Sequence, residues 1–184
     1  FDQLVFTCHL ARLYVVKNFE LRLKAKVTGN NTGIQYRSKE LKEVGPWSVG
    51  GYQCDIHPAI EHTGMTYEEK GRGIFGLNGK DVVLDPEGKR WLVAEREPVG
   101  ADVSQWNEYT VIARGNTLIH KVNGKITSQL TDYDGKNRSL EGLLAIQLHR
   151  GNANTVQIKE LKLKTLPVTA PAGFTADTLP KNAA

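Results

Sequence analysis

Strict alternation of apolar and charged residues over Phe19–Val27 is the feature that most constrains the fold of this chain. Apolar side chains occupy every second position, and Glu, Arg and Lys fill the positions between them. Successive side chains of a β-strand point to opposite faces, so a period of two indicates a strand with one buried and one solvated face. Such a strand needs a second layer to cover its apolar side.

Similar short segments follow along the chain, separated by turn residues. Asn123-Gly124 lies between two of them and is the strongest hairpin signal. No convincing helix period is present, and 184 residues are typical of one compact domain. We therefore expect an all-β sandwich or barrel with about nine or ten strands. They are predicted near residues 19–27, 33–37, 50–57, 74–77, 91–94, 106–114, 117–122, 142–149 and 155–164, with one more after Asn123-Gly124.

The two ends of the chain differ from this pattern. Residues 167–184 contain Pro and small residues without alternation, so 1–166 is predicted to be the domain and 167–184 a Pro/Ala-rich tail that lies against a partner. Residues 4–16 are apolar but lack a basic region and a cleavage site, so no signal peptide is predicted. No run approaches ~20 apolar residues, which excludes a membrane-spanning helix.

Charge and cysteine content restrict the partners. The 24 basic and 20 acidic residues give a net charge of +4. Both signs are mixed along the chain, which favours solvated faces over a nucleic-acid or phosphate surface.

Cys8 and Cys54 form no CxxC or zinc pattern, and two free buried thiols or one bridge are both compatible with the sequence. Cys54 falls on the apolar face of its strand, so we expect a buried thiol.

Three predicted strands carry apolar residues on one face and directional polar groups on the other. The apolar set predicted to be buried is Leu21, Leu23, Tyr36, Ile56, Leu144, Ile146 and Leu148. The polar sets are Gln35 and Arg37; Gln53, Asp55 and His57; and Gln147 and His149.

These polar faces have two interpretations. They are either the wet side of a sandwich or a surface whose amide, acid, guanidinium and imidazole groups hold sugar hydroxyls. Trp47, Tyr67 and Trp106 are available as aromatic platforms. His57 and His149 with Asp55 suit a base with its orienting partner, or a metal site, although no HExxH spacing is present. His9 and His62 are expected in surface or packing roles, and His120 can face either way. GxSxG and P-loop motifs are absent.

Several ordered motifs then resemble a known family. They read NFELRLKAKVTGNNTGIQYRS, GGYQCDI, HTGMTYEEKGRG, QWNEYTVIARGNTLIHKVNG, GLLAIQLHRG and VQIKELKLK. Over about residues 15–165 the chain resembles the 3-keto-disaccharide hydrolase domain family, long catalogued as a domain of unknown function and as candidate secreted glycosyl hydrolases. The resemblance implies a concanavalin-like jelly-roll sandwich and a periplasmic or extracellular location.

The chain departs from the family at two points. Its start looks truncated, because family members usually have several strands before the NFEL segment. Many members carry Glu then Gln in the motif after Gly-Tyr, whereas this chain has Gln53 and Asp55, so the acid is displaced by two residues.

The resemblance also implies a reaction. A 3-keto group acidifies the hydrogen on C2 of a sugar, a base removes it, the glycosidic oxygen leaves C1, and water adds. We expect His149 or Asp55 as base and Arg37 as electrophile or orienter, with a divalent metal ion as an optional polarising group. The residues expected to bind the sugar are Gln35, Gln53, His57, Gln147, Tyr67 and Trp47. The alternative is a non-catalytic, lectin-like or structural subunit that docks on a larger protein assembly.

Overall fold

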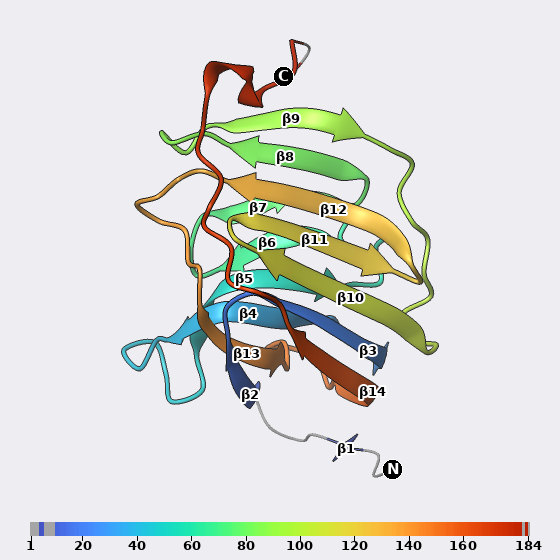
Figure 1. Ribbon diagram of the computed structural model, residues 1–184. Coiled ribbons are helices and arrows are strands. Elements are labelled where there is room, and N and C mark those ends of the chain that lie inside the picture. The colour runs from blue at the N-terminus through green and yellow to red at the C-terminus, as the bar shows by residue number, and fades with distance from the viewer. Residues whose placement is uncertain (1–3, 6–9, 182, 184) are drawn as a thin grey trace.

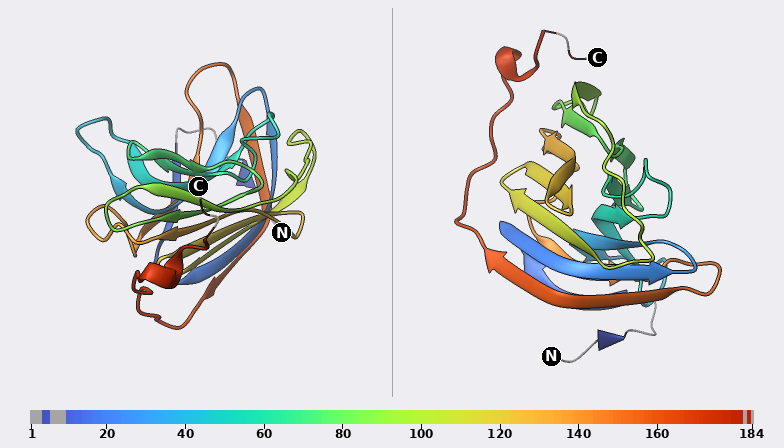
Figure 2. Two further views of the ribbon diagram at one scale, coloured as in Figure 1. Left: turned by 90° about the horizontal axis from the view of Figure 1, so that it is seen from above. Right: turned by 90° about the vertical axis from the view of Figure 1, so that its right-hand side faces the viewer.

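A computed structural model describes residues 4–5, 10–181 and 183 and shows two β-sheets packed face to face (Figures 1 and 2). The larger sheet has eight strands in the order β1 (Leu4–Val5), β14 (Thr155–Thr165), β3 (Phe19–Thr28), β10 (Asn107–Arg114), β11 (Thr117–Val122), β12 (Lys125–Asp132), β8 (Lys80–Leu84) and β9 (Arg90–Glu95). The smaller sheet has six, in the order β2 (Leu10–Val16), β13 (Gly142–Gln147), β4 (Thr32–Glu40), β5 (Val49–Ile56), β6 (Thr66–Glu69) and β7 (Gly73–Gly76). The expected all-β jelly-roll sandwich is confirmed.

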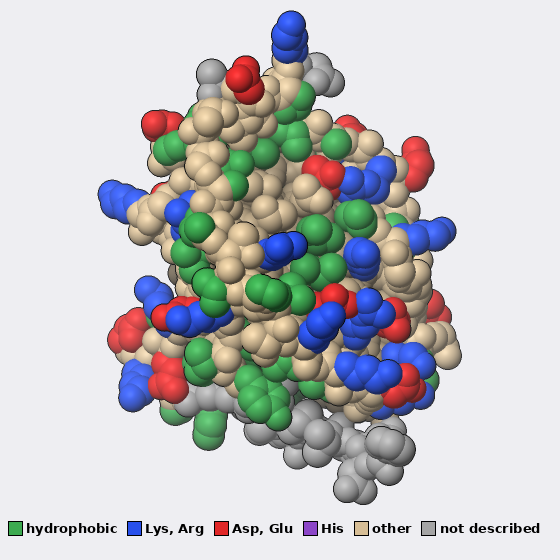
Figure 3. Space-filling model, in the orientation of Figure 1, with side chains coloured by type: hydrophobic (Ala, Val, Ile, Leu, Met, Phe, Trp, Pro, Cys, Tyr) green, Lys and Arg blue, Asp and Glu red, His purple; other side chains and the backbone are tan. Residues whose placement is uncertain are grey.

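The predicted period of two builds the core between the sheets. Leu21 and Leu23 of β3 are fully buried, while Arg22 between them is exposed. Figure 3 shows Lys and Arg side chains at the surface over this part of the larger sheet. Six of the seven residues predicted to be buried are at most 6% exposed. Leu148 is only partly buried, because β13 ends at Gln147 and Leu148 packs against the edge of the core.

His120 and Cys54 are among the polar groups inside this core. His120 of β11 is fully buried, and its Nε2 lies 2.8 Å from the hydroxyl of Tyr36 across the sheets. Burial lowers the pKa of His120 to about 4, which keeps the ring neutral. Cys54 is a free, buried thiol whose pKa burial raises, as its strand face predicts, whereas Cys8 lies outside the described residues.

The β11–β12 hairpin shows why Asn-Gly was informative. Asn123 and Gly124 both have positive φ angles, 50° and 78°, and join strands that end at Val122 and begin at Lys125. Two such residues make the tight turn whose twist matches a β-hairpin. Four strands were not predicted: β1, β2, β6 and β8. Of these, β1 has only two residues, β6 four and β8 five.

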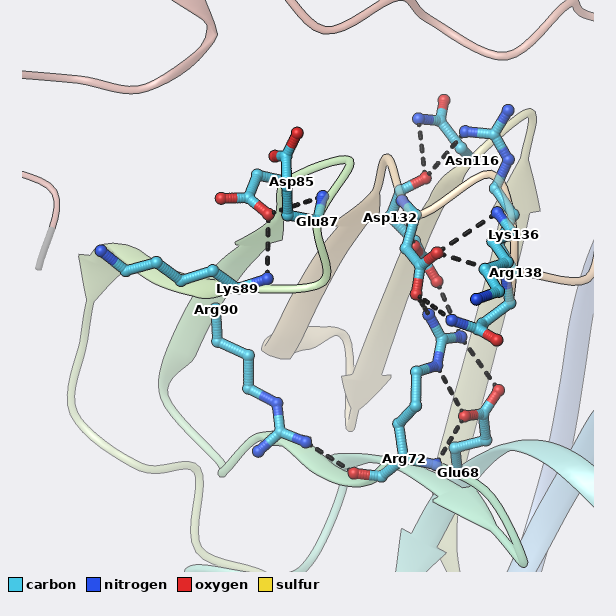
Figure 4. Close-up of polar contacts among 12 residues, drawn as sticks. Glu68, Arg72, Asp85, Glu87, Lys89, Arg90, Asn116, Asp132, Lys136 and Arg138 are labelled. Atoms are coloured by element: carbon cyan, nitrogen blue, oxygen red, sulfur yellow. Dashed lines mark hydrogen bonds and ion pairs between the residues drawn. The ribbon is translucent and has the colours of Figure 1, made fainter.

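A buried ion cluster ties the two sheets together at one end (Figure 4). Arg72, in the β6–β7 turn, pairs with Glu68 at 2.7 Å, Asp132 of β12 at 2.9 Å and Asp134 at 3.3 Å. The hydroxyl of Tyr52, on β5, donates to Asp132 at 2.5 Å. Removal of one partner from such a buried set leaves charges uncompensated, so the cluster fixes how the sheets dock.

The tail packs along the outer side of the larger sheet (Figure 2). Asn18 donates to the carbonyl of Pro167 at 2.9 Å, and the side chain of Asn116 accepts from the backbone of Ala172 at 2.9 Å. The ring of Phe174 meets Tyr133 edge-on, just before the short 3₁₀ helix η1 (Ala176–Thr178). Residues 167–174 therefore contact the sandwich itself. Docking of the tail on a partner protein stays a prediction.

Candidate functional site

The outer face of the smaller sheet gathers polar side chains from strands β13, β4 and β5. Gln35 of β4 lies opposite Gln53 of β5, and Gly33 lies opposite Asp55. Ala145 of β13 pairs with Gln35 on the other side. The inner positions between them, such as Cys54 and Ile34, are fully buried in the core. The strand register thus places the amides of Gln35, Gln53 and Gln147 and the acid of Asp55 on the same face.

Gly33 makes room for this arrangement. A Cβ atom at Gly33 would lie 2.4 Å from Cδ and 2.7 Å from Nε2 of Gln53. Because these distances are far below van der Waals contact, the Gln53 side chain can lie over β4 only if position 33 has no side chain. Gln53 there reaches both Asp55 and Gln147.

A chain of hydrogen bonds joins two carboxylates across the face. Nε2 of Gln147 donates to Glu69 of β6 at 3.4 Å, and Oε1 of Gln147 accepts from Gln53 at 3.5 Å. The same Gln53 amide nitrogen donates to Oδ1 of Asp55. The side-chain oxygens of Gln35 and Gln53 are buried without a hydrogen-bond partner. Unpaired buried acceptors are costly, and a ligand hydroxyl placed here would satisfy them.

Asp55 is the most perturbed acid of this face. Its side chain is 6% exposed, and burial, opposed by the Gln53 hydrogen bond and reinforced by the charge of Glu69, raises its pKa to about 7. Tyr67, opposite Gln53 on β6, also has a raised pKa from burial and from the charges of Glu69 and Asp55. A carboxyl poised near neutral pH is suited to proton transfer.

A groove of about 640 Å³ opens beside these residues. Gln35, Glu69 and Gln147 form part of its lining, with residues 44–48 of the β4–β5 loop and Val49 of β5 on one side and residues 148–150 after β13 on the other. Trp47 is 56% exposed at its rim. We call this feature, together with Gln53 and Asp55, the amide groove.

Two predicted histidines lie at one margin of this face. His149 is exposed and lines the groove, and its Nδ1 lies 3.2 Å from the side-chain amide of Asn30. His57 follows the end of β5, and its Nδ1 accepts from the backbone of Ala59 at 2.9 Å. The pKa of His57 is lowered by burial, by His62, whose ring centroid lies 5.0 Å from that of His57, and, more weakly, by His149. His149 is thus part of the groove, and His57 lies next to it.

The prediction that Arg37 shares the face of Gln35 is wrong. A bulge interrupts the β4–β5 pairing after Tyr36, and Arg37 has a φ of 49°. The reversed phase buries its guanidinium, which donates to the carbonyls of Lys17 at 2.9 Å and Gly115 at 2.7 Å and to the side chain of Asn18 at 3.2 Å. Arg37 therefore joins backbone segments and does not reach the amide groove.

Trp106 also lies away from the amide groove, and the residues that the structure describes include no evident metal centre. Trp106 precedes β10 in the larger sheet, where the ammonium of Lys159 lies 4.2 Å from its ring centre. Among the described residues, no group of three or more His, Cys, Asp or Glu side chains is arranged to hold a metal ion. A divalent metal ion, left open by the sequence, therefore has no such ligand set in the described part of the chain.

Two important residues of the groove were not predicted. Glu69 falls in a four-residue strand without a clear alternating signal, and Gly33 was predicted only as the first residue of its strand. Their roles depend on cross-strand neighbours, which only the register of β4, β5 and β6 reveals.

Comparisons with known proteins agree with this fold. The model of a family described as the 3-keto-alpha-glucoside-1,2-lyase-like domain matches residues 9–164. No curated protein matches the chain.

Solved structures with this fold include two candidate glycosyl hydrolases from Parabacteroides distasonis. One has 15% identity and a TM-score of 0.53 over 83% of this chain and 80% of its own. The other has 18% identity and a TM-score of 0.53 and covers 90% of this chain and 76% of its own. The carbohydrate-binding module CBM66 from Bacillus subtilis has 10% identity and a TM-score of 0.53, and the match covers 83% of this chain and 78% of the module. At these identities the similarity shows the fold alone. The family match spans most of the 184 residues, and the chain belongs to the 3-keto-alpha-glucoside-1,2-lyase-like domain family.

Proposed function

We propose that the chain cleaves the glycosidic bond of 3-keto-glycosides in the amide groove, with Asp55 as the general base. The observation that carries the proposal is the buried Asp55 carboxyl, whose pKa lies at about 7 next to a groove lined with amides. At neutral pH such a group is about half ionised, so it can both take up and return a proton.

The reaction balances without an external oxidant. The Asp55 carboxylate removes the proton from C2, which the C3 ketone acidifies. The electron pair forms a C1–C2 double bond while the bond from C1 to the glycosidic oxygen breaks, and the departing oxygen receives a proton. Water then adds its oxygen to C1, and a proton returns to C2. The net result is hydrolysis.

Other side chains of the amide groove have roles that match their positions. His149 is exposed beside Asn30 and is assigned to protonate the departing oxygen. The amides of Gln35 and Gln53 offer unpaired oxygens to sugar hydroxyls, and rotation of an amide presents its N–H groups to the developing enolate oxygen. Trp47 at the rim supplies an apolar ring for the sugar face.

A second candidate function is carbohydrate binding without cleavage. The observation in its favour is the cover over Asp55, which is only 6% exposed and bonded to Gln53, so a substrate reaches the acid only after Gln53 moves. One protein with the same fold is a carbohydrate-binding module. In this case the groove would hold sugars through Gln35, Gln147 and Trp47 alone.

Product analysis with 3-keto-trehalose and related 3-keto-glycosides separates the two candidates. Asp55→Asn should lower kcat by at least ~10²-fold with little change in KM, the usual scale for a general base. Asp102→Asn, an exposed acid outside the groove, is the matched control and should retain full turnover. Binding by the wild type without turnover of any 3-keto substrate would favour the second candidate. Equal turnover by wild type and Asp55→Asn would remove Asp55 from the mechanism.

The location of the chain is also part of the proposal. We assign it to the periplasm or cell exterior, where glycosides are encountered, on the strength of the family alone. In the described part of the chain, no helix has the length and apolar character needed to cross a membrane.

A further inference from the structure

Glu69 is a second carboxylate of the amide groove, and the reaction proposed above gives it no role. It ends β6, lines the groove and has a side chain that is 19% exposed. Its two oxygens have different partners. Oε1 lies 3.6 Å from the ammonium of Lys70, and Oε2 accepts from Nε2 of Gln147 at 3.4 Å. Glu69 therefore joins the surface of the groove to the amides of the sheet face.

Hydrogen bonds lead from Glu69 to Asp55. Gln147 lies on β13, three strands from β6 in the sheet (Figure 1). Its Oε1 accepts from Nε2 of Gln53 at 3.5 Å, and the same nitrogen donates to Oδ1 of Asp55. A side-chain amide has two N–H hydrogens, so both hydrogens of Gln53 are in use, and its oxygen is the atom left unpaired.

The carboxylate at the start of this chain decides how the amides are turned. A carboxylate only accepts hydrogen bonds, so Glu69 draws the nitrogen of Gln147 toward itself and leaves the oxygen of that amide for Gln53. With its nitrogen directed at both Gln147 and Asp55, Gln53 lies over the acid as its cover. The position of Gln53 thus depends on a residue from another strand.

The charge of Glu69 acts on the same acid. Burial raises the pKa of Asp55 to about 7, the hydrogen bond from Gln53 opposes this rise, and the charge of Glu69 adds to it. Gly33 faces Asp55 from β4 and adds no charge. The other titratable side chains around this face are Tyr67 of β6, His57 after β5 and His149 after β13.

We propose that Glu69 is a positioning residue of the amide groove, which acts through Gln147 to hold Gln53 over Asp55 and places a second negative charge at the same site. One consequence rests on the proposed function: Glu69 sets the lowest pH at which Asp55 acts as a base. The position of Gln53 and the titration of Asp55 do not depend on that function, so they are measured without substrate.

NMR of the full chain tests the proposal with two variants. Glu69→Gln removes the charge but keeps an acceptor for Gln147, and Glu69→Leu removes both. In Glu69→Gln the titration midpoint of the Asp55 carboxyl carbon should move to lower pH by ~0.5 unit or more. In Glu69→Leu the side-chain amide protons of Gln53 should exchange with solvent at least ~3-fold faster, on the scale of one lost hydrogen bond. Glu69→Gln should keep the wild-type exchange rate.

The matched control is Glu87→Gln, which changes an exposed acid of the β8–β9 turn in the other sheet. It should leave both the Asp55 midpoint and the Gln53 exchange rate as in the wild type. Wild-type backbone amide shifts outside the groove confirm that each variant is folded. A midpoint that stays in place in Glu69→Gln would overturn the proposal, and so would wild-type exchange of Gln53 in Glu69→Leu.

The pH dependence of turnover separates this proposal from the proposed function. With a 3-keto-glycoside as substrate, the acid limb of kcat against pH should move down in Glu69→Gln by the same interval as the Asp55 midpoint, and should not move in Glu87→Gln. A wild type that turns over no 3-keto-glycoside, with the Asp55 midpoint still displaced in Glu69→Gln, would support the positioning role and overturn the proposed function alone.

Discussion

The buried acid of the amide groove should make the folded protein less stable as pH rises. Burial lifts the pKa of Asp55 from 3.8 to about 7, so the folded state keeps a proton that the unfolded chain releases near pH 4. Between these pH values the folded state binds more protons, and the free energy of unfolding therefore falls with increasing pH. Over an interval from 3.8 to about 7, at ~1.4 kcal/mol per unit, the loss amounts to about 4 kcal/mol.

Asp55→Asn removes this penalty while it keeps an oxygen that accepts from Gln53. The variant should match the wild type near pH 4 and exceed its free energy of unfolding above pH 7, by up to about 4 kcal/mol. Urea denaturation at several pH values between 4 and 8 measures the difference. Asp177→Asn, an exposed acid of η1, is the control and should leave the pH dependence unchanged. Stability curves for wild type and Asp55→Asn that stay parallel across this range would refute the argument.

Three more variants test the core, the ion cluster and the groove. Leu23→Ala removes a fully buried side chain and should cost ~2–5 kcal/mol in urea denaturation; a loss under about 1 kcal/mol would mean that the sheets do not pack through this residue. Arg72→Met leaves three paired carboxylates without their cation and should cost about 3–5 kcal/mol at pH 7, with a smaller cost once acid protonates them. Gly33→Ala forces the flexible Gln53 side chain aside from Cγ outward, so it should weaken sugar binding in calorimetry yet leave the melting temperature nearly unchanged. Gly173→Ala, which meets nothing within 4 Å, is its control, and equal affinities in both glycine variants would contradict the assigned role of Gln53.

Local alternation was enough to predict much of the fold. Leu21, Leu23 and Cys54 each lie on strands whose phase can be read from their immediate neighbours, and each is buried. The same reasoning placed Gln53 and Asp55 on the opposite face of β5, because a regular strand keeps its period of two.

The prediction for Arg37 failed where the backbone departs from regular geometry. A bulge with a positive φ at Arg37 reverses the phase of β4, and no residue type in this segment announces it. The extent of the groove was equally hidden. Glu69 reaches Gln147 from a strand three positions away in the sheet, and this contact follows from the strand order, which alternation does not specify.

The most direct test of the account follows the C2 hydrogen of the substrate. The wild type is incubated with a 3-keto-glucoside in D₂O, and the released sugar is examined by NMR, with Asp55→Asn in parallel. The account predicts that the wild type releases 3-keto-glucose with deuterium at C2 faster than spontaneous exchange introduces it, and that Asp55→Asn does so at least ~10²-fold more slowly. Cleavage that retains the original hydrogen at C2, or cleavage at the same rate by Asp55→Asn, would contradict it.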